Sequence, residues 1–553
     1  MITASKLALA AGLMAAVVGG CATASAQDAR PVVTAPAGAV RGVAEAGIAA
    51  FKGIPYAAPP VGMNRWRPPA PAAAWSGVRD AAQFGAACIQ PTRWVESIYS
   101  ADLGATSEDC LTLNIWSPST APTTKAPVIV WIHGGALVSG SSKEMLYDGS
   151  NLAATGAVVV SINYRLGVLG WLAHPDLSAE SPVGISGNYG LLDQVAALTW
   201  VQRNIEAFGG DPTNVTIAGE SAGGLSVMYL MATPLARNLF HKAIAQSAYM
   251  ISTPELKTAR FGAVSGEDYG TRLARTVQAP SLRVLRGMDP QALTDAAALG
   301  GFSPFGVVDG TVLPRQLVDT FDKGEQAPVP ILAGFNAGEI RSLRMLAPAT
   351  PASAADYERT IRAQYGDLAD EFLRLYPSTD MGESILAATR DGLYGWTSER
   401  LVRSQTTAGQ PSFLYLFDHA SPATDQAGLH AFHASELPYL FGTLDRTPPR
   451  WPKIANTPSE RGLSDAMIGY WTSFARTGQP QAEGSATWSP YAPGGAYLAL
   501  RDVPVAASDL MPGMFALNER VMCRRRANGT QGWNWNIGLA SPPMQAPAED
   551  CVR

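Results

Sequence analysis

The chain has 553 residues, of which 47% are hydrophobic and 16% are charged, and its formal net charge is −5 at pH 7. This composition is typical of a globular protein with a large core. Apart from an arginine triplet at 524–526 there is no basic cluster, which argues against a nucleic-acid partner and against an anionic membrane surface.

The N-terminus has the pattern of an export signal, which predicts a periplasmic or secreted protein. Lys6 precedes an apolar stretch over residues 7–18, and small residues follow as far as Ala26. The apolar stretch is too short to span a bilayer as a helix, and no other segment is apolar enough to do so.

Two ways of processing this signal remain open. Cleavage after residues 1–26 would release a soluble protein. Alternatively, the sequence Val-Gly-Gly-Cys ending at Cys21 resembles a lipoprotein box, which would remove residues 1–20 and leave a lipid anchor on the cysteine. Soluble release is slightly favoured, because Gly19 is not the best residue for such a box.

Four cysteines remain once Cys21 is set aside: Cys88, Cys110, Cys523 and Cys551. An oxidising compartment favours pairing, and three connectivities are possible. Proximity in sequence favours the first with the second and the third with the fourth, each bond adding about 3 kcal/mol of stability through the unfolded state. A metal site is disfavoured because no Cys-x-x-Cys or Cys/His cluster accompanies them.

Apolar runs alternate with helical patterns over most of the chain, which predicts an α/β fold with a mostly parallel sheet flanked by helices. The expected elements, in chain order, are an antiparallel lead-in over 32–51, strands over 128–132 and 158–162, a helix over 189–208 that ends at Gly209, strands over 215–217, 242–246 and 330–334, a helical roof over 357–407 and a strand over 413–417. One domain over 27–553 with large loop and helical insertions fits better than three.

The only Gly-x-Ser-x-Gly of the chain is Gly219-Glu220-Ser221-Ala222-Gly223, which directly follows the apolar run 215–218. After a buried strand this pattern predicts a nucleophile elbow, a strained turn into a helix that exposes the serine hydroxyl. The two glycines let neighbouring backbones pass closely, and the helix N-terminus faces developing negative charge. Taken alone, the pattern could also be a tight turn without chemistry.

A serine hydroxyl is a weak nucleophile at neutral pH, so it needs a base and an orienting acid. After such an elbow the expected chain order is serine, acid, histidine, which leaves His419, His430 and His433 as bases. His433 is preferred because it opens a loop followed by an apolar segment, and His430 is its main rival.

The acid should lie between the elbow and the histidine, where Asp309 and Glu339 are the main choices. Glu339 is preferred because it follows the buried strand 331–334, and catalytic groups of open α/β sheets gather at the carboxyl ends of the strands. Asp309 precedes a glycine and is typical of a turn.

An anion-binding loop is predicted at His133-Gly134-Gly135-Ala136, which follows the strand ending at Ile132. Small residues there allow a substrate oxygen to approach the backbone N–H groups. The expected donors are Gly135, Ala136 and Ala222, although a Gly-Gly pair after a strand could also be only a loop.

Further motifs occur in a fixed order along the chain. They are Phe-Lys-Gly-Ile-Pro-Tyr-Ala at 51–57, Ser-Glu-Asp-Cys-Leu-Thr-Leu-Asn at 107–114, and Phe-Gly-Gly-Asp-Pro at 208–212 ahead of the serine pentapeptide. With these motifs, most of the mature chain resembles the type-B carboxylesterase and cholinesterase family of α/β-hydrolases.

The resemblance implies an α/β-hydrolase fold and a serine hydrolase that cleaves small-molecule carboxylic esters through an acyl-enzyme, without a metal or organic cofactor. It implies these residues and roles: Ser221, Glu339 and His433 as the triad, Gly135, Ala136 and Ala222 as the oxyanion hole, Ser247 near the acid and the histidine, and a disulfide between Cys88 and Cys110. Glu220, next to the serine, is also expected to border the site.

Two other classes of function remain. One is a non-catalytic binding or adhesion protein on the same scaffold, which is disfavoured because all three triad members are present. The other keeps the chemistry but cleaves an amide, thioester or lactone. Arg341 and Arg344, just past Glu339, are a weak indication of an ester that carries a free carboxylate.

Overall fold

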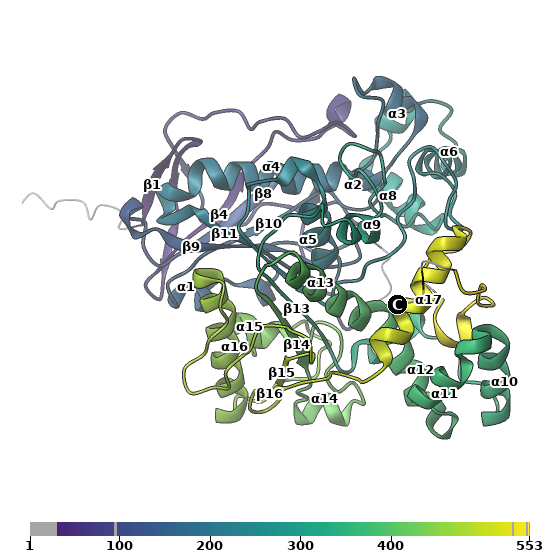
Figure 1. Cartoon of the computed structure of the whole chain (residues 1–553). Coiled ribbons are helices and arrows are strands. Elements are labelled where there is room, and N and C mark those ends of the chain that lie inside the picture. The colour runs from purple at the N-terminus through teal and green to yellow at the C-terminus, as the bar shows by residue number, and fades with distance from the viewer. Residues whose placement is uncertain (1–29, 93–96, 534–535, 549–550, 552–553) are drawn as a thin grey trace, which may run out of the picture.

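Strands rich in β-branched residues form the centre of the protein (Figure 1). The computed structural model describes residues 30–92, 97–533, 536–548 and 551, so the expected export signal and Cys21 lie outside the described residues. The strands are, in chain order, β1 (Val32–Ala35), β2 (Gly38–Arg41), β3 (Val43–Glu45), β4 (Ile48–Pro55), β5 (Val78–Asp80), β6 (Ala87–Cys88), β7 (Thr106–Ser107), β8 (Thr112–Ser117), β9 (Ala126–Ile132), β10 (Val158–Ile162), β11 (Gly210–Glu220), β12 (Lys242–Gln246), β13 (Ile331–Asn336), β14 (Ser412–Phe417), β15 (Tyr497–Leu500) and β16 (Val505–Ala507).

Eleven of these strands pair in one sheet with the order β16-β15-β14-β13-β12-β11-β9-β10-β8-β4-β3. The strands from β15 to β10 in this order run parallel to one another, whereas β16, β8, β4 and β3 are antiparallel to the strands beside them. The predicted α/β fold with a mostly parallel sheet is therefore confirmed.

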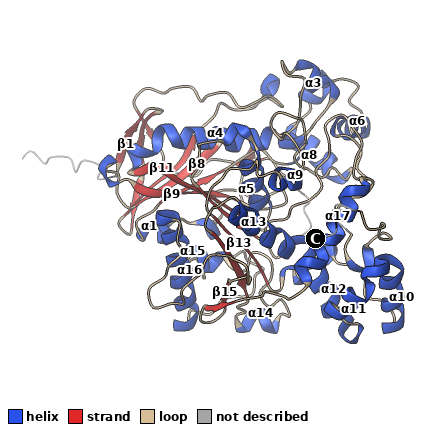
Figure 2. Cartoon of the chain, in the orientation of Figure 1, coloured by secondary structure: helices blue, strands red, loops and turns tan. Residues whose placement is uncertain are grey.

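Helices cover both faces of this sheet (Figure 2). They are α1 (Ser150–Ala154), α2 (Gly167–Trp171), α3 (Pro175–Glu180), α4 (Tyr189–Asn204), α5 (Ala222–Ala232), α6 (Gly266–Thr276), α7 (Leu282–Gly287), α8 (Pro290–Leu299), α9 (Leu317–Asp322), α10 (Ala354–Tyr365), α11 (Ala369–Leu375), α12 (Met381–Arg390), α13 (Trp396–Thr407), α14 (Pro422–Gln426), α15 (Leu437–Phe441), α16 (Pro458–Thr477) and α17 (Met514–Asn528). Among the residues that the structure describes, no helix is both long and apolar enough to cross a bilayer.

The sheet has a separate apolar core on each face, because successive side chains of a strand point to opposite sides. On β9, Val128 and Val130 pack in the same core as α4 and α5, while Ile129 and Trp131 pack in the core that contains residues of α1, α15 and α16. A strand that is buried on both faces shows no polar alternation. This is why the strands of the centre could be found as continuous apolar runs.

The predicted elements agree closely with the observed ones. The strands expected at 128–132, 158–162, 242–246, 330–334 and 413–417 correspond to β9, β10, β12, β13 and β14. The strand expected at 215–217 is the end of the longer β11, and the helix expected at 189–208 is α4 followed by a 3-10 turn (Ile205–Phe208). Gly209 stops this helix with φ 81°, as the glycine there predicted.

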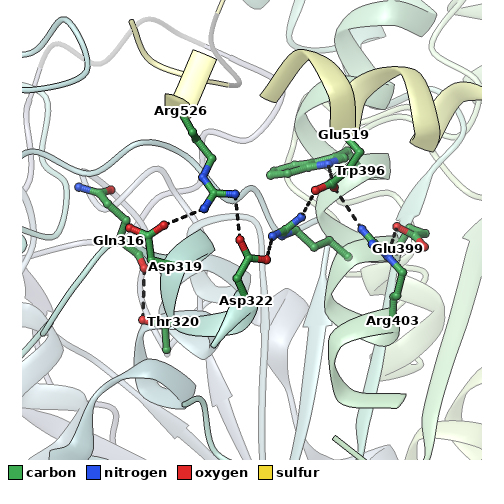
Figure 3. A network of polar contacts seen from close by, with 10 residues as sticks. Gln316, Asp319, Thr320, Asp322, Trp396, Glu399, Arg403, Glu519 and Arg526 are labelled. Carbon is green, nitrogen blue, oxygen red and sulfur yellow. Dashed lines mark hydrogen bonds and ion pairs between the residues drawn. The ribbon is translucent and has the colours of Figure 1, made fainter. Parts of the chain in front are cut away.

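The helical stretch expected at 357–407 contains α10 to α13, with one π-helical turn (Asp391–Gly395) between α12 and α13. Its last helix is joined to α9 and α17 by a network of charged side chains (Figure 3). Glu519 of α17 accepts hydrogen bonds from Trp396 (2.8 Å) and Arg403 (3.1 Å), and it also pairs with Arg400.

The same network continues to the last turn of α17. Arg526 contacts Asp319 (2.8 Å) and Asp322 (2.9 Å) of α9, and Asp322 in turn pairs with Arg400 of α13. Arg400 thus lies between carboxylates of two other helices, and its side chain is only 3% exposed. We infer that these ion pairs hold the C-terminal helix against the helix that follows the π-helical turn.

We expect Arg400→Met to lower the free energy of unfolding by about 2 kcal/mol, because it removes buried charge-assisted hydrogen bonds while both carboxylates keep a second arginine. The midpoint of urea unfolding measures this change. Arg501→Met is the matched control, because the Arg501–Asp418 pair is 57% and 35% exposed and should contribute less than about 1 kcal/mol. Equal losses in the two variants would contradict the inference.

Candidate functional site

The serine predicted as nucleophile lies at the carboxyl edge of the sheet, in the turn between β11 and α5. Ser221 has φ 56° and ψ −118°, a conformation that is unfavourable for a residue with a Cβ atom. Its N–H donates to the carbonyl of Gln246 at the end of β12 (2.9 Å), and its own carbonyl accepts from Leu225 N in α5 (2.9 Å). The neighbouring strand and the helix therefore hold the strained turn from both sides.

The two glycines of the pentapeptide are required by close backbone contacts. A Cβ atom on Gly223 would lie 2.0 Å from the carbonyl oxygen of Ile132 in β9, and one on Gly219 would lie 2.5 Å from the carbonyl carbon of Gly223. Both distances are far below van der Waals contact. The Gly-x-Ser-x-Gly pattern thus follows from how the turn folds on itself and packs on β9.

The predicted acid follows the end of β13. Glu339 begins a 3-10 turn (Glu339–Arg341), and its residue is fully buried. Its Oε1 accepts hydrogen bonds from Ser247 Oγ (2.6 Å) and from Asn336 N (2.8 Å). Ser247, expected near the acid, therefore contacts it directly. A buried carboxylate without such donors would be strongly disfavoured.

The predicted base lies between two carboxylates. His433 Nδ1 forms a hydrogen bond with Glu339 Oε2, and His433 Nε2 lies 3.1 Å from Glu220 Oε1. In the described part of the chain, no hydrogen bond joins Nε2 to the hydroxyl of Ser221. The structure thus brings the candidate acid and base together, and it directs the free ring nitrogen at the residue next to the serine.

These contacts change the proton affinities of both groups. Burial opposes the charged form of the His433 imidazole, but Glu220 and Glu339 outweigh burial and raise its pKa to about 9. Burial, with repulsion from Glu436 and Glu339, raises the pKa of Glu220 to about 8 against the attraction of His433. The pair therefore retains a proton near neutral pH.

A third carboxylate, Glu436, was not assigned a role from the sequence. Its oxygens accept from Gln246 Nε2 (3.0 Å) and Asn336 Nδ2 (2.6 Å), and burial raises its pKa to about 7. The signal that could have found it is a carboxylate three residues after His433, in a segment that is otherwise mostly apolar. No periodicity marks it, since the residues that donate to it come from β12 and β13.

The predicted anion loop has a tight conformation after β9. Gly135 has φ 102° and Ala136 has φ 55°, and the carbonyl of Gly135 accepts from Val138 N (2.9 Å) and Ser139 N (3.0 Å). Within the described residues, the N–H groups of Gly135 and Ala136 donate no hydrogen bond. Ala222 is the first residue of α5, so its N–H has no partner within the helix.

The loop packs directly on the serine turn. A Cβ atom on Gly134 would lie 2.7 Å from Glu220 Oε2 and 3.3 Å from the Cβ atom of Ser221. His133, which precedes it, stacks on Tyr164 with ring centroids 4.6 Å apart. Burial lowers the pKa of His133 to about 4, so its imidazole is neutral and serves in packing.

The rival residues lie in other surroundings. Asp309 Oδ1 accepts from the N–H groups of Thr311, Val312 and Leu313, as expected of a turn residue. His430 is exposed, and its Nδ1 pairs with Asp425.

The two arginines noted after Glu339 have other surroundings than the three carboxylates near His433. Arg341 Nη2 donates to Glu383 Oε2 (2.5 Å), and it lines a cavity of about 260 Å³ together with Gly338, Ile340 and Arg390. Arg344 is exposed. The groups that raise the pKa of His433 are the carboxylates Glu220, Glu339 and Glu436, so the surroundings of the base are acidic.

Two disulfides are present in the described part of the chain. Cys88 pairs with Cys110, and Cys523 of α17 pairs with Cys551. The first closes the segment 88–110, which reaches the site through Tyr99. The Tyr99 hydroxyl lies 2.9 Å from the carbonyl oxygen of His433.

Comparison with known proteins identifies the relatives of this chain. Residues 29–510 match the model of the carboxylesterase family. A fumonisin B1 esterase of Sphingopyxis macrogoltabida is 39% identical over 82% of this chain and 83% of its own length, and a para-nitrobenzyl esterase of Bacillus subtilis is 37% identical over 83% and 92%. The solved structure of a Geobacillus stearothermophilus carboxylesterase matches with a TM-score of 0.76 and 34% identity, over 88% of this chain and all of that one.

Gly223→Ala tests the packing of the serine turn. We expect a loss of about 3 kcal/mol of stability, because the added methyl group collides with backbone atoms of β9 that cannot move away without displacing the sheet. The midpoint of thermal unfolding measures it. Gly462→Ala in α16 is the matched control, because open space surrounds that position and alanine favours a helix by up to about 1 kcal/mol. Similar midpoints for both variants would contradict the expectation.

Proposed function

Because this chain belongs to the carboxylesterase family and is a carboxylic ester hydrolase, we propose that Ser221 is its nucleophile, His433 its base and Glu339 the orienting acid. The observation that supports these roles most directly is the buried contact between His433 Nδ1 and Glu339, beside the strained turn that holds Ser221. Such a contact fixes the tautomer in which Nε2 is free to accept a proton.

In the proposed acylation step, His433 Nε2 accepts the proton of Ser221 Oγ while that oxygen attacks the ester carbonyl. Nε2 must first leave Glu220, which lies 3.1 Å away in the present structure. Glu220 and Ser221 are adjacent in the chain, so in the proposed step the ring nitrogen changes its partner from one residue to the next. The imidazolium then gives its proton to the leaving alcohol.

The charge that develops on the carbonyl oxygen needs donors that are already in place. We assign this role to the N–H groups of Gly135, Ala136 and Ala222, which the tight loop and the start of α5 leave available. Deacylation repeats the sequence with water in place of the serine. His433 removes a proton from the water, and Ser221 is the leaving group.

The acidic groups near the base indicate a further role for Glu220. As a carboxylate it stabilises the imidazolium that forms in both steps, and as a neutral acid it no longer forms an ion pair at Nε2. Because its pKa lies above its ordinary value, the group can exchange between these states near neutral pH. We propose that it modulates the basicity of His433.

We also propose that the protein is exported. The two disulfides support an oxidising compartment, and the pattern of the first 26 residues supports an export signal. Release as a soluble protein and anchoring through a lipid on Cys21 differ in the mass of the mature N-terminal peptide, which mass spectrometry can determine.

Ser221→Ala tests the nucleophile. We expect kcat/KM for a para-nitrobenzyl ester to fall by about 10⁶-fold, because no other hydroxyl would be placed to form the acyl-enzyme. An organophosphate should label the wild type at Ser221 and should leave the variant unlabelled. Ser226→Ala, in the α5 helix just beyond the turn, is the control and should keep activity and labelling. Undiminished turnover in Ser221→Ala would reject the assignment.

Glu220→Gln tests the control of basicity. His433 must be neutral to act as a base, so activity should rise with pH through its pKa. Removing the Glu220 charge lowers that pKa from about 9 towards the ordinary value, and the acid limb of kcat/KM should move to lower pH by about 1 unit or more. Glu144→Gln is the control, because Glu144 raises the pKa of Glu220 and its own carboxylate accepts from Ser141 N, and a smaller shift is expected. An acid limb that stays at the same pH, or moves to higher pH, in Glu220→Gln would contradict the proposal.

A further inference from the structure

The loop that carries His433 has no strand to hold it, and its backbone is instead held by three hydrogen bonds from outside. The carbonyl of Ala431 accepts from Gly338 N (2.8 Å), and that of Phe432 accepts from Asn336 Nδ2 (2.8 Å). The carbonyl of His433 itself accepts from the hydroxyl of Tyr99 (2.9 Å). Consecutive carbonyls of the loop are thus fixed one by one.

The first two donors belong to the segment that leads to Glu339, whereas Tyr99 belongs to the segment closed by the Cys88–Cys110 disulfide. The Tyr99 hydroxyl also lies 2.7 Å from the Oγ of Ser342, which follows the turn that begins with Glu339. Since the carbonyl of His433 can only accept, the tyrosine proton points to it, and Ser342 donates to the tyrosine oxygen. One hydroxyl therefore joins the acid segment to the base segment.

The peptide group after His433 has an unfavourable neighbour, so a hydrogen bond is needed to hold it in place. The carbonyl held by Tyr99 is part of the peptide group between His433 and Ala434, and Ala434 has φ 68°. That conformation is unfavourable for a residue with a Cβ atom, so the peptide group would tend to rotate if it were released. Its rotation would carry the imidazole away from Glu339.

The ring of Tyr99 adds packing to the hydrogen bond. It meets the His433 ring edge to face, with centroids 6.3 Å apart, and it meets Trp451 in the same way at 6.1 Å. Tyr394 of the π-helical turn is a second aromatic neighbour of the imidazole, at 5.2 Å. These contacts leave the imidazole little freedom in the plane that faces Glu339.

The hydroxyl can donate throughout the working range of the enzyme. Burial raises the pKa of Tyr99 well above its ordinary value, and the charges of Glu220 and Glu339 raise it further against the hydrogen bond from Ser342. The phenol therefore keeps its proton where His433 titrates.

We propose that Tyr99 is a positioning residue for the reaction: its hydroxyl holds the His433 carbonyl and so keeps the imidazole on Glu339. This inference rests on the proposed triad. It gives the segment closed by the Cys88–Cys110 disulfide a part in catalytic geometry, in addition to its effect on stability.

Tyr99→Phe tests the proposal, because it keeps the ring and its packing and removes only the hydroxyl. We expect kcat to fall by about tenfold with little change in KM. This loss is smaller than the roughly hundredfold loss that a 1 Å displacement of a reacting group can cause, because Glu339 still contacts the imidazole. A looser contact with Glu339 also lowers the pKa of His433. The acid limb of kcat/KM should therefore move to lower pH, a change that a merely structural role would not produce.

Tyr357→Phe is the matched control, because Tyr357 donates a hydrogen bond of similar length (3.0 Å) to the carbonyl of Tyr376 in the helical roof. It should leave kcat and the pH profile unchanged. Ser342→Ala should lower kcat less than Tyr99→Phe does, and the double variant should equal Tyr99→Phe, since Ser342 reaches the histidine loop through the tyrosine.

Unchanged kcat and pH profile in Tyr99→Phe would overturn the proposal, and so would an equal loss in Tyr357→Phe. If Tyr99→Phe does not fold, as judged by circular dichroism, Ser342→Ala is the deciding variant. Its kcat should fall and the acid limb of its kcat/KM profile should move to lower pH. No change in either would overturn the proposal. Ser221→Ala separates failure of the triad from failure of the Tyr99 proposal. If the triad is wrong, Ser221→Ala remains active. If only the role of Tyr99 is wrong, Ser221→Ala is inactive and Tyr99→Phe is as active as the wild type.

Discussion

The buried carboxylate of Glu339 is the group on which the rest of the site depends. It lies at zero exposure, where a charge is tolerated only with hydrogen-bond donors around it. Its donors come from the end of β13, from Ser247 after β12, and from the loop of His433. The two neighbouring strands and that loop must therefore keep one arrangement, because losing any donor would remove part of the hydrogen bonding of a carboxylate in the core.

A second consequence of this arrangement is the acidity of the surroundings. Glu220, Glu339 and Glu436 all influence His433, and burial raises the pKa values of Glu220 and Glu436. Charge repulsion among the three would be costly if all were ionised, so the cluster holds protons that isolated carboxylates would lose. The basicity of the imidazole thus depends on the protonation of a group of residues, and Glu220 is the member that contacts the nitrogen facing the serine.

The sequence predicted those parts of the fold and site that depend on local pattern. Strands buried on both faces were found as apolar runs, and the serine turn was found because Gly219 and Gly223 are required by backbone contacts that only glycine allows. Family, fold and ester hydrolysis are confirmed by the relatives and the sheet, while the residue roles stay predictions. Glu436 and Tyr99 were missed for one reason: their partners lie far away in the chain, 334 residues in the case of Tyr99 and His433, and no spacing along the sequence encodes such contacts.

The strands and the loops of the site fix their catalytic side chains in different ways. Ser221 and Glu339 follow adjacent parts of a parallel sheet, so the register of β11, β12 and β13 sets their separation with little freedom. His433 lies on a loop, which has no ladder of backbone hydrogen bonds to fix it. Its consecutive carbonyls are instead bound by Gly338, Asn336 and Tyr99, two of which belong to the acid's own segment. The acid therefore orients the base twice, through its carboxylate and through the backbone that carries it. Only the third bond comes from elsewhere in the chain, which makes Tyr99 the one contact of this set that can change without moving Glu339.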